Sequence, residues 1–231
     1  MKLCMIGTGY VGLVSGTCFA DIGNQVYCVD KDKNKIDKLN SGVSPIYEPG
    51  LDELIKKNYD ANRLIFTTDI KKAINASDLI FICVGTPTKK GSLKVDLSFV
   101  YKCVKEVLKH TKKKKIIITK STVPVGTGAE IEKIIKKKKK LFSVISNPEF
   151  LREGEAIRDF RYPDRIVIGS DNKSQFQTMK KLYSPLISKG AKFFTTTRKG
   201  AELIKYASNA FLATKITFIN ELANLCEKTG V

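Results

Sequence analysis

The residues best suited to chemistry near the start of the chain form a glycine-rich turn. Gly7-Thr8-Gly9-Tyr10-Val11-Gly12 has the pattern G-x-G-x-x-G and lies between an apolar run, Lys2–Ile6, and an amphipathic run, Val11–Asp21. In a strand–turn–helix context the first glycine permits the tight turn, the second lets the backbone approach a diphosphate, and the third lets the helix pack on the strand. The amides that open the helix would hold the diphosphate. The motif therefore predicts binding of a dinucleotide.

Asp30 follows the next apolar run, Gln25–Val29, and indicates which dinucleotide binds. Its carboxylate can accept hydrogen bonds from the 2′- and 3′-hydroxyls of a ribose and would repel a 2′-phosphate, so NAD is favoured over NADP. Lys31, Lys33 and Lys35 leave tolerance of the extra phosphate open, because a nearby cation could accommodate it.

Three further segments place polar side chains directly after apolar runs. In a doubly wound sheet, ligands collect beyond the carboxyl ends of the strands, so these side chains are candidates for ligand contact. They are Thr86 in Val84–Thr88, Ser121 and Thr122 in Lys120–Gly126, and Glu149 and Glu153 in Asn147–Gly154. If the chain turns helical after Pro148, the two carboxylates share a face at the spacing i, i+4. Capped turns and solvated carboxylates are the alternatives.

Lys205 and Asn209 lie one turn apart in a segment that is predicted to be helical. A lysine and an amide on one face could hold an alkoxide or oxyanion, because one supplies charge and the other a directed donor. A solvated helix face is the alternative interpretation.

These sites require a scaffold, and the chain alternates short apolar runs with longer amphipathic ones. The strand-like runs are Lys2–Ile6, Gln25–Val29, Leu64–Phe66, Leu79–Val84, Ile116–Thr119, Phe142–Ile145, Arg165–Ile168 and Lys192–Phe194. The helix-like segments between them are Val11–Asp21, Lys33–Asn40, Leu51–Lys57, Ile70–Ala76, Leu97–His110, Gly128–Lys137 and Asn172–Leu186. Nearly all-apolar strands are typical of parallel sheets covered on both faces. The class is therefore α/β, with a doubly wound Rossmann-like parallel sheet.

The last stretch, from about Gly200 to Glu227, has apolar residues at helical spacing and neither proline nor glycine after its first residue. It predicts one helix of about 40 Å, at a rise of 1.5 Å per residue. Helices of that length often bridge domains or join subunits. We expect a dinucleotide-binding domain over residues 1–196 and the start of a connecting helix over 197–231, with further chain beyond Val231.

Composition excludes several classes of protein. Hydrophobic residues make up 42% and charged residues 28% of the 231, which rules out wholesale disorder. No run approaches the ~18 apolar residues that a membrane helix needs. The six cysteines form no C-x-x-C pair and only one histidine is present, so no metal site is expected. Cysteines within apolar runs, such as Cys4, Cys28 and Cys83, suit burial in a reducing, cytoplasmic compartment.

The net charge of +18 includes two lysine runs, Lys112–Lys115 and Lys136–Lys140. Both fall at predicted helix ends, where solvated lysines are favoured by the negative helix C-terminus. A patch that binds polyanions is the alternative. Because no aromatic residues interleave either run, as a stacking platform for nucleic acid would require, no nucleic-acid partner is expected.

Taken together, these motifs resemble the UDP-glucose 6-dehydrogenase family, within the wider nucleotide-sugar 6-dehydrogenases. The resemblance covers nearly the whole chain, in family order and spacing. The matching stretches are Met5–Leu13, Pro45–Leu51, Cys83–Thr88, Ser121–Gly126, Ser146–Asp159, Pro163–Gly169 and Ala201–Glu221. The resemblance implies oxidation of the C6 alcohol of a nucleotide sugar to a carboxylate with two NAD, through an aldehyde and a cysteine thioester. It also implies a homodimer or higher homo-oligomer built on the long helix.

The resemblance implies a role for each matching residue. Thr122 and Glu149 would handle water and protons at C6, where Lys205 and Asn209 would stabilise oxygen charge. The nucleotide-sugar substrate would be bordered by Phe150, Leu151 and Arg152, together with Glu149, Lys205 and Asn209. The cofactor would contact Gly7, Gly9, Tyr10, Val11, Gly12, Asp30, Lys35, Thr86, Ser121 and Glu153.

One departure limits what the resemblance implies. The family's nucleophilic cysteine lies in a glycine-rich segment after the long helix, and none of the six cysteines here occupies that motif. The chain is therefore expected to be the NAD-binding half of such an enzyme, able to bind NAD but not to turn over UDP-glucose alone. A sister enzyme acting on GDP-mannose or a UDP-N-acetyl-hexosamine, and a non-catalytic NAD-binding module, are the alternatives.

Overall fold

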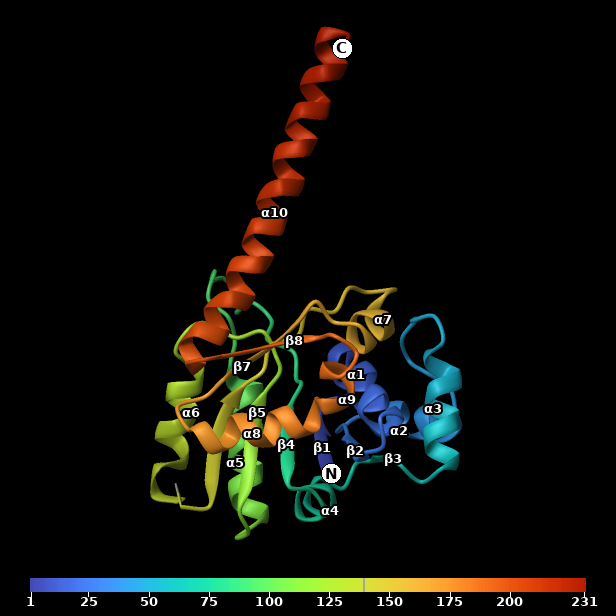
Figure 1. The fold of residues 1–231 in the computed structure, drawn as a ribbon, viewed down its shortest axis with the longest axis vertical. Coiled ribbons are helices and arrows are strands. Elements are labelled where there is room, and N and C mark those ends of the chain that lie inside the picture. The colour runs from blue at the N-terminus through green and yellow to red at the C-terminus, as the bar shows by residue number, and fades with distance from the viewer. Residues whose placement is uncertain (139) are drawn as a thin grey trace.

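An eight-stranded sheet forms the centre of the computed structural model, which describes residues 1–138 and 140–231 (Figure 1). Its order is β3-β2-β1-β4-β5-β6-β7-β8. The strands are β1 (Lys2–Ile6), β2 (Gln25–Val29), β3 (Leu64–Thr67), β4 (Leu79–Ile82), β5 (Lys115–Thr119), β6 (Phe142–Ser146), β7 (Arg165–Gly169) and β8 (Lys192–Thr196). All eight predicted strands are present, and the doubly wound Rossmann-like class is confirmed.

Helices cover both faces of the sheet, as the apolar strands require. They are α1 (Tyr10–Asp21), α2 (Lys33–Asn40), α3 (Leu51–Asp60), α4 (Ile70–Ala76), α5 (Ser98–His110), α6 (Thr127–Ile135), α7 (Ala156–Arg161), α8 (Lys173–Leu182), α9 (Ser184–Ile187) and α10 (Arg198–Thr229). One core cluster joins the sheet to α1, α2, α3, α7, α8 and α9. A second joins it to α4, α5 and α6. All four residues of β4 are buried because it lies between these two cores.

The direction of β7 differs from the expected parallel sheet. β1 to β6 pair in parallel, whereas β6 and β7 meet antiparallel, with Ser146 opposite Gly169, and β8 is again parallel to β7. A short apolar run carries no signal of strand direction, because both kinds of buried strand show the same pattern.

Three local predictions were wrong. The segment after Pro148 is not helical up to Glu155, and the helix that follows, α7, was not predicted. The single helix expected over Asn172–Leu186 is two helices that meet at Tyr183, because Pro185 near the start of α9 has no N–H to continue α8.

One lysine run is not wholly a solvated turn. Lys112, Lys113 and Lys114 are exposed, but Lys115 belongs to β5 and is only 4% exposed. Its ammonium donates to the carbonyl oxygens of Ser77 and Asn75, and burial lowers its pKa. In the second run, Lys139 lies outside the described residues, while the Lys138 ammonium donates to Leu108 O near the end of α5 at 2.7 Å.

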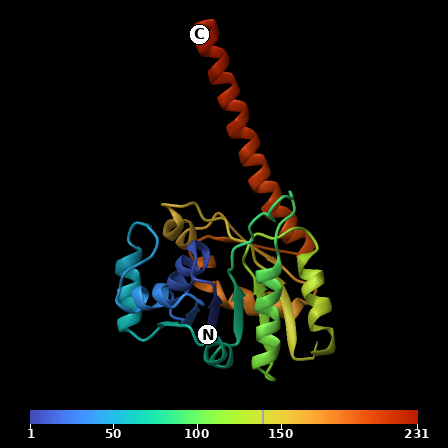
Figure 2. The same ribbon diagram turned by 180° about the vertical axis from the view of Figure 1, so that it is seen from behind.

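The long helix α10 is anchored at its first turns and then projects far from the sheet (Figures 1 and 2). The Arg198 guanidinium pairs with Glu132 at 2.6 Å. The buried Glu202 carboxylate accepts from the N–H groups of Gly126 and Gly128, at 2.6 and 2.7 Å. Beyond Tyr206 nearly every residue is exposed, including Phe211 and Phe218 at 68% and 62%. Among the described residues, no helix is both long and apolar enough to cross a membrane.

Candidate functional site

A cleft of about 840 Å³ lies beyond the carboxyl ends of β1, β2 and β4. It brings together five of the predicted cofactor residues, which belong to four different segments: Gly7, Gly9, Asp30, Lys35 and Thr86. Such a position is where doubly wound sheets bind nucleotides. The remaining predicted cofactor residues do not line this cleft: they are Tyr10, Val11, Gly12, Ser121 and Glu153.

The glycine-rich turn has the shape that a diphosphate requires. Gly7 has a φ of +102°, and a Cβ there would come within 2.7 Å of Cys83 O. A Cβ on Gly12 would lie 1.9 Å from Gly7 O, so α1 can approach the turn only with glycine at this position. At Gly9, by contrast, a Cβ would meet no protein atom within 4 Å. The backbone that opens α1 therefore faces open space, and the turn fits NAD.

Asp30 is held by its neighbours at the end of β2. One of its oxygens accepts from Thr8 N at 3.0 Å, from Thr8 Oγ1 at 2.8 Å and from Lys35 Nζ at 3.4 Å. The other accepts from Asp32 N at 3.1 Å. Burial alone would raise the pKa of Asp30, but these hydrogen bonds outweigh burial and lower the pKa. The carboxylate is thus ionised and oriented, as a ribose acceptor must be.

The lysines beside Asp30 are already engaged with protein groups. Lys35 pairs with Asp30, and the Lys31 ammonium lies over the Phe99 ring, 5.6 Å from its centroid. Cation–π contacts of this kind hold the ammonium in place. Both lysines line the cleft. A 2′-phosphate there would meet Lys35, which is paired with a carboxylate, and Lys31, which lies over an aromatic ring.

The hydroxyls after β4 and β5 join two loops. Thr86 Oγ1 donates to Thr122 O at 2.8 Å, and Ser121 Oγ donates to Val84 O at 2.6 Å. Their hydroxyl protons are therefore committed to the backbone, which leaves the oxygen lone pairs for a ligand. Thr122 is half-buried, in a gap that it shares with Ser121 and Lys205.

Lys205 reaches from α10 to the loop after β6. Its ammonium lies 2.9 Å from Glu149 Oε1, and the two side chains are only 8% and 10% exposed. The other Glu149 oxygen accepts from Leu151 N at 2.7 Å. The Phe150 ring is flanked by two cations, Lys205 Nζ at 5.3 Å and the Arg165 guanidinium at 4.4 Å. Sequence spacing did not predict this pair, because Glu149 and Lys205 are far apart along the chain.

Asn209 is exposed on α10, one turn beyond the buried Lys205, and it lines neither the cleft nor the gap at Ser121 and Thr122. The helix has begun to leave the sheet at that point. Lys205 and Asn209 therefore lie on the same face of α10, but the first is buried and the second is exposed.

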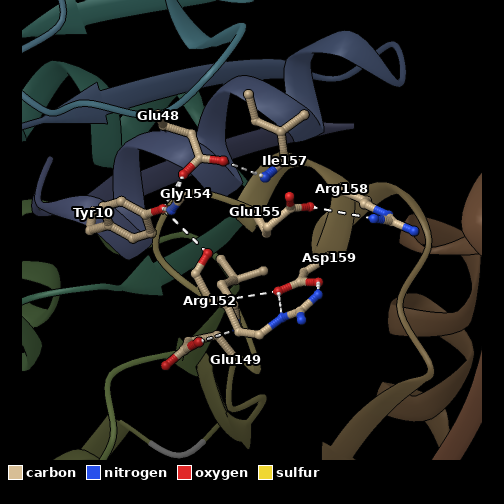
Figure 3. Close-up of polar contacts among 10 residues, drawn as sticks. Tyr10, Glu48, Glu149, Arg152, Gly154, Glu155, Ile157, Arg158 and Asp159 are labelled. Carbon is tan, nitrogen blue, oxygen red and sulfur yellow. Dashed lines mark hydrogen bonds and ion pairs between the residues drawn. The ribbon is translucent and has the colours of Figure 1, made fainter.

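A second cavity, of about 620 Å³, is lined by the loop after β6 together with residues of α7 and of the segment before β7. Its lining includes Glu149, Phe150, Leu151 and Arg152, the residues expected at the sugar. The Arg152 side chain is turned toward Asp159, to which Nη2 and Nε donate at 2.6 and 3.0 Å. The Arg152 side chain is 70% exposed, while its backbone N–H also donates to Asp159, at 2.9 Å (Figure 3).

Tyr10 opens α1 and connects it to the turn that carries Glu153 (Figure 3). Its hydroxyl donates to the buried Glu48 carboxylate and accepts from Gly154 N at 2.8 Å. Burial and the hydrogen bond to Glu48 raise the pKa of Tyr10 to about 12, so the phenol is neutral. The Glu153 side chain itself is exposed, and Val11 is half-buried.

Sequence reasoning gave no role to three buried ionisable residues beside the site. Glu48 and Glu202 tie loops together through backbone N–H groups, and Lys120 lines the second cavity while being 4% exposed. Burial lowers the pKa of Lys120. All three residues lie within or next to a stretch that resembles the family. Their burial could not be predicted from the sequence, because it results from contacts between segments that are far apart along the chain.

The cysteines behave as packing residues rather than nucleophiles. All six are unpaired, and five are buried. Burial raises the pKa of Cys18 and Cys83 to about 12 and that of Cys103 to about 11, so these thiols stay protonated. Cys226, on the projecting part of α10, is half-buried. Within residues 1–138 and 140–231, no three His, Cys, Asp or Glu side chains are grouped to hold a metal ion.

The fold and the cleft define a Rossmann-type dinucleotide-binding protein, with a buried lysine–glutamate pair beside the cofactor position. Residues 1–187 match the NAD binding domain of the UDP-glucose/GDP-mannose dehydrogenase family, and residues 199–231 match the family's central domain. The chain belongs to this family, and NAD is its cofactor.

Relatives and solved structures agree with this assignment. The chain is 54% identical to UDP-glucose 6-dehydrogenase of Rhizobium meliloti, over all of this chain and 54% of that protein. It is 52% identical to UDP-glucose 6-dehydrogenase TuaD of Bacillus subtilis, over 99% of this chain and 50% of that protein. The structure of GDP-mannose dehydrogenase from Pseudomonas aeruginosa is similar, with a TM-score of 0.92, 38% identity and coverage of 100% of this chain and 54% of that chain. The chain thus spans about half the length of its relatives.

Proposed function

We propose that the protein to which these residues belong oxidises the C6 alcohol of UDP-glucose to the carboxylate of UDP-glucuronate. The observation that carries the proposal is the buried ion pair between Lys205 of α10 and Glu149 of the loop after β6. Lys205 also lines the gap that contains Ser121 and Thr122, which follow β5. The names of the relatives, at 54% and 52% identity, favour UDP-glucose.

The proposed chemistry divides among a few groups of this chain. NAD, when bound, would accept a hydride in each of two oxidations. The Lys205 ammonium would stabilise negative charge on the C6 oxygen, with Asn209 as a second donor. Glu149 would hold the lysine in place and, with Thr122, move protons and water at C6. None of the chain's own buried thiols is assigned to the thioester step, because burial keeps them protonated.

We further propose a role for each of the binding residues. Gly7, Gly9, Tyr10, Val11 and Gly12 would contact the diphosphate, and Asp30 and Lys35 the adenosine ribose. Further along the cofactor, contacts would come from Thr86, Ser121 and Glu153. Phe150, Leu151 and Arg152 would border the sugar nucleotide, in part through backbone groups.

The proposed division into domains follows the boundary between β8 and α10. Residues 1–196 would form the NAD-binding domain and 197–231 the start of a connecting helix. The exposed apolar residues of α10, such as Phe211, Phe218 and Ile219, would pack against a second copy in a homodimer or higher homo-oligomer. The unpaired cysteines suit a cytoplasmic location.

A sister activity on GDP-mannose is the second candidate. The structural similarity to a GDP-mannose dehydrogenase, at a TM-score of 0.92, favours it. The residues described above do not separate the two candidates, because the chain resembles the same half of both kinds of enzyme.

The experiment is a substrate panel with the intact protein and NAD, followed by NADH absorbance. UDP-glucose should be oxidised with two NADH formed per sugar. Faster oxidation of GDP-mannose would favour the second candidate, and no oxidation of any nucleotide sugar would refute both. As a control on the site, Lys205→Met should abolish most of the turnover while leaving the affinity for NAD unchanged.

A further inference from the structure

The Glu48 carboxylate is buried although it belongs to the loop between α2 and α3 and forms no ion pair among the described residues. The residue is 6% exposed. One oxygen accepts from the Tyr10 hydroxyl and from Gly154 N at 2.9 Å, and the other accepts from Ile157 N at 3.2 Å. A buried charge of this kind is tolerated only when such donors surround it.

The partners of Glu48 come from the start of α1, from the turn at residues 152–154 and from the start of α7. Gly154 N reaches both Glu48 Oε2 and the Tyr10 hydroxyl, and the same hydroxyl lies 3.4 Å from Arg152 O. Arg152 N is held from the other side by Asp159 at 2.9 Å. The peptide groups before and after Glu153 are therefore both fixed, as Figure 3 shows around Tyr10, Glu48 and Gly154.

Glu153 stands between these fixed groups with its own side chain exposed. It is close enough to Tyr10 for its charge to raise the pKa of the phenol. Tyr10 is in turn the first residue of α1, next to the open space over Gly9. The Glu153 carboxylate is therefore exposed to a ligand, while the backbone on either side of it is tied to Tyr10 at the start of α1.

We infer that Glu48 is a positioning residue for the cofactor site: it holds Tyr10 and the turn at residues 152–154 together, and so sets where Glu153 meets the nicotinamide half of NAD. This rests on the proposed function. Glu48 meets Tyr10 only at the phenol oxygen, whereas the diphosphate would contact the backbone amides that open α1. We therefore expect Glu48 to affect the part of the cofactor that Glu153 reaches, and not the diphosphate or the adenine half.

The test compares two probes that differ only in the nicotinamide, NAD and ADP-ribose, by calorimetry on the intact protein. Glu48→Gln keeps the side-chain shape but turns an acceptor into a donor that faces other donors. The dissociation constant of NAD should rise about tenfold, the change that follows loss of one charge-assisted hydrogen bond, while that of ADP-ribose stays unchanged. Glu53→Gln is the matched control, because Glu53 is exposed on the neighbouring α3, and it should change neither constant.

A double-mutant cycle separates positioning from a general effect on folding. If Glu48 acts through Glu153, then Glu48→Gln should have no further effect on NAD in a Glu153→Gln background. Tyr10→Phe, which removes the bridging hydroxyl, should reproduce the selective loss and serves if Glu48→Gln does not fold. Equal weakening of both probes, additive effects, or an unchanged NAD affinity would overturn the inference. Failure of the unmodified protein to bind NAD would instead refute the proposed function.

Discussion

Replacing Lys205 by methionine tests how much the buried pair contributes to stability, separately from catalysis. Methionine keeps most of the apolar stem of lysine, so the main loss is the charge. The Lys205 ammonium lies 2.9 Å from Glu149 Oε1, with both side chains about nine-tenths buried. The remaining Glu149 oxygen keeps its hydrogen bond from Leu151 N at 2.7 Å, which compensates the carboxylate only in part.

The magnitude follows from these contacts. At an effective dielectric constant of 20, two charges at this separation attract by about 6 kcal/mol, most of which offsets the cost of removing both ions from water. Removing one partner of a buried pair costs about 3–5 kcal/mol, because the other charge is left uncompensated. The lost contact with the Phe150 ring, at 5.3 Å, is smaller, about 0.5–1 kcal/mol. We expect Lys205→Met to destabilise the protein by about 3 kcal/mol.

The assay is urea denaturation at neutral pH, followed by circular dichroism. The double variant Lys205→Met/Glu149→Gln should recover about 2 kcal/mol, since it no longer buries an unpaired charge. Lys133→Met, which removes an exposed ion pair with Glu130 on α6, should leave the midpoint nearly unchanged. A loss below about 1 kcal/mol in Lys205→Met, or no recovery in the double variant, would refute the reasoning.

Three further outcomes can be checked separately. Asp30→Asn should weaken NAD by about tenfold and reduce the preference over NADP, as measured by calorimetry with each dinucleotide; an unchanged preference would count against the ribose role. Burial opposes ionisation of Asp21, but hydrogen bonds from Lys57 and Arg161 lower its pKa below the usual 3.8. Its stabilising effect is therefore complete above that value and lost as pH falls through the lower folded pKa. Acid titrations of Asp21→Asn should accordingly show a smaller loss of stability below pH 3.8 than the unmodified protein. Tyr183→Phe leaves the buried Asn147 Oδ1 without its donor, at 2.6 Å, and should cost about 1–3 kcal/mol in thermal denaturation.

The elements that sequence predicts well are those whose pattern is local. β1, β2, α2 and α4 match their predicted bounds to the residue, because an apolar run or a capping aspartate fixes each end. The helix α7 was missed because its six residues follow a polar loop and contain too few turns to show a period. Lys115 was misjudged because the apolar character of β5 decides its burial, whereas the lysines before it suggest solvent.

The cofactor side of the site could likewise be predicted, since Gly7, Gly9, Gly12 and Asp30 belong to one strand–helix–strand unit. Their contacts with one another span about 25 residues of sequence, whereas the close approach of Cys83 to Gly7 and Gly12 comes from further along the chain. Tyr10, Glu48 and Gly154 could not be joined in this way, because the contacts link residues separated by 38 and 144 positions. No local pattern records such pairings.

The placement of the Lys205–Glu149 pair depends on the strand direction that the sequence pattern did not reveal. Because β7 runs antiparallel from Arg165 to a single register pair between Gly169 and Ser146, its first residue lies beside the loop that follows β6 rather than below it. The Arg165 guanidinium accordingly stacks on Phe150 at 4.4 Å. β8 pairs with β7 and leads directly into α10, which packs against β6 and β7 and so brings Lys205 to Glu149. A parallel β7 would carry Arg165 away from Phe150 and would lead α10 to a different place. The buried pair is thus a consequence of topology, and residue spacing along α10 alone could indicate a lysine–amide face but not its partner.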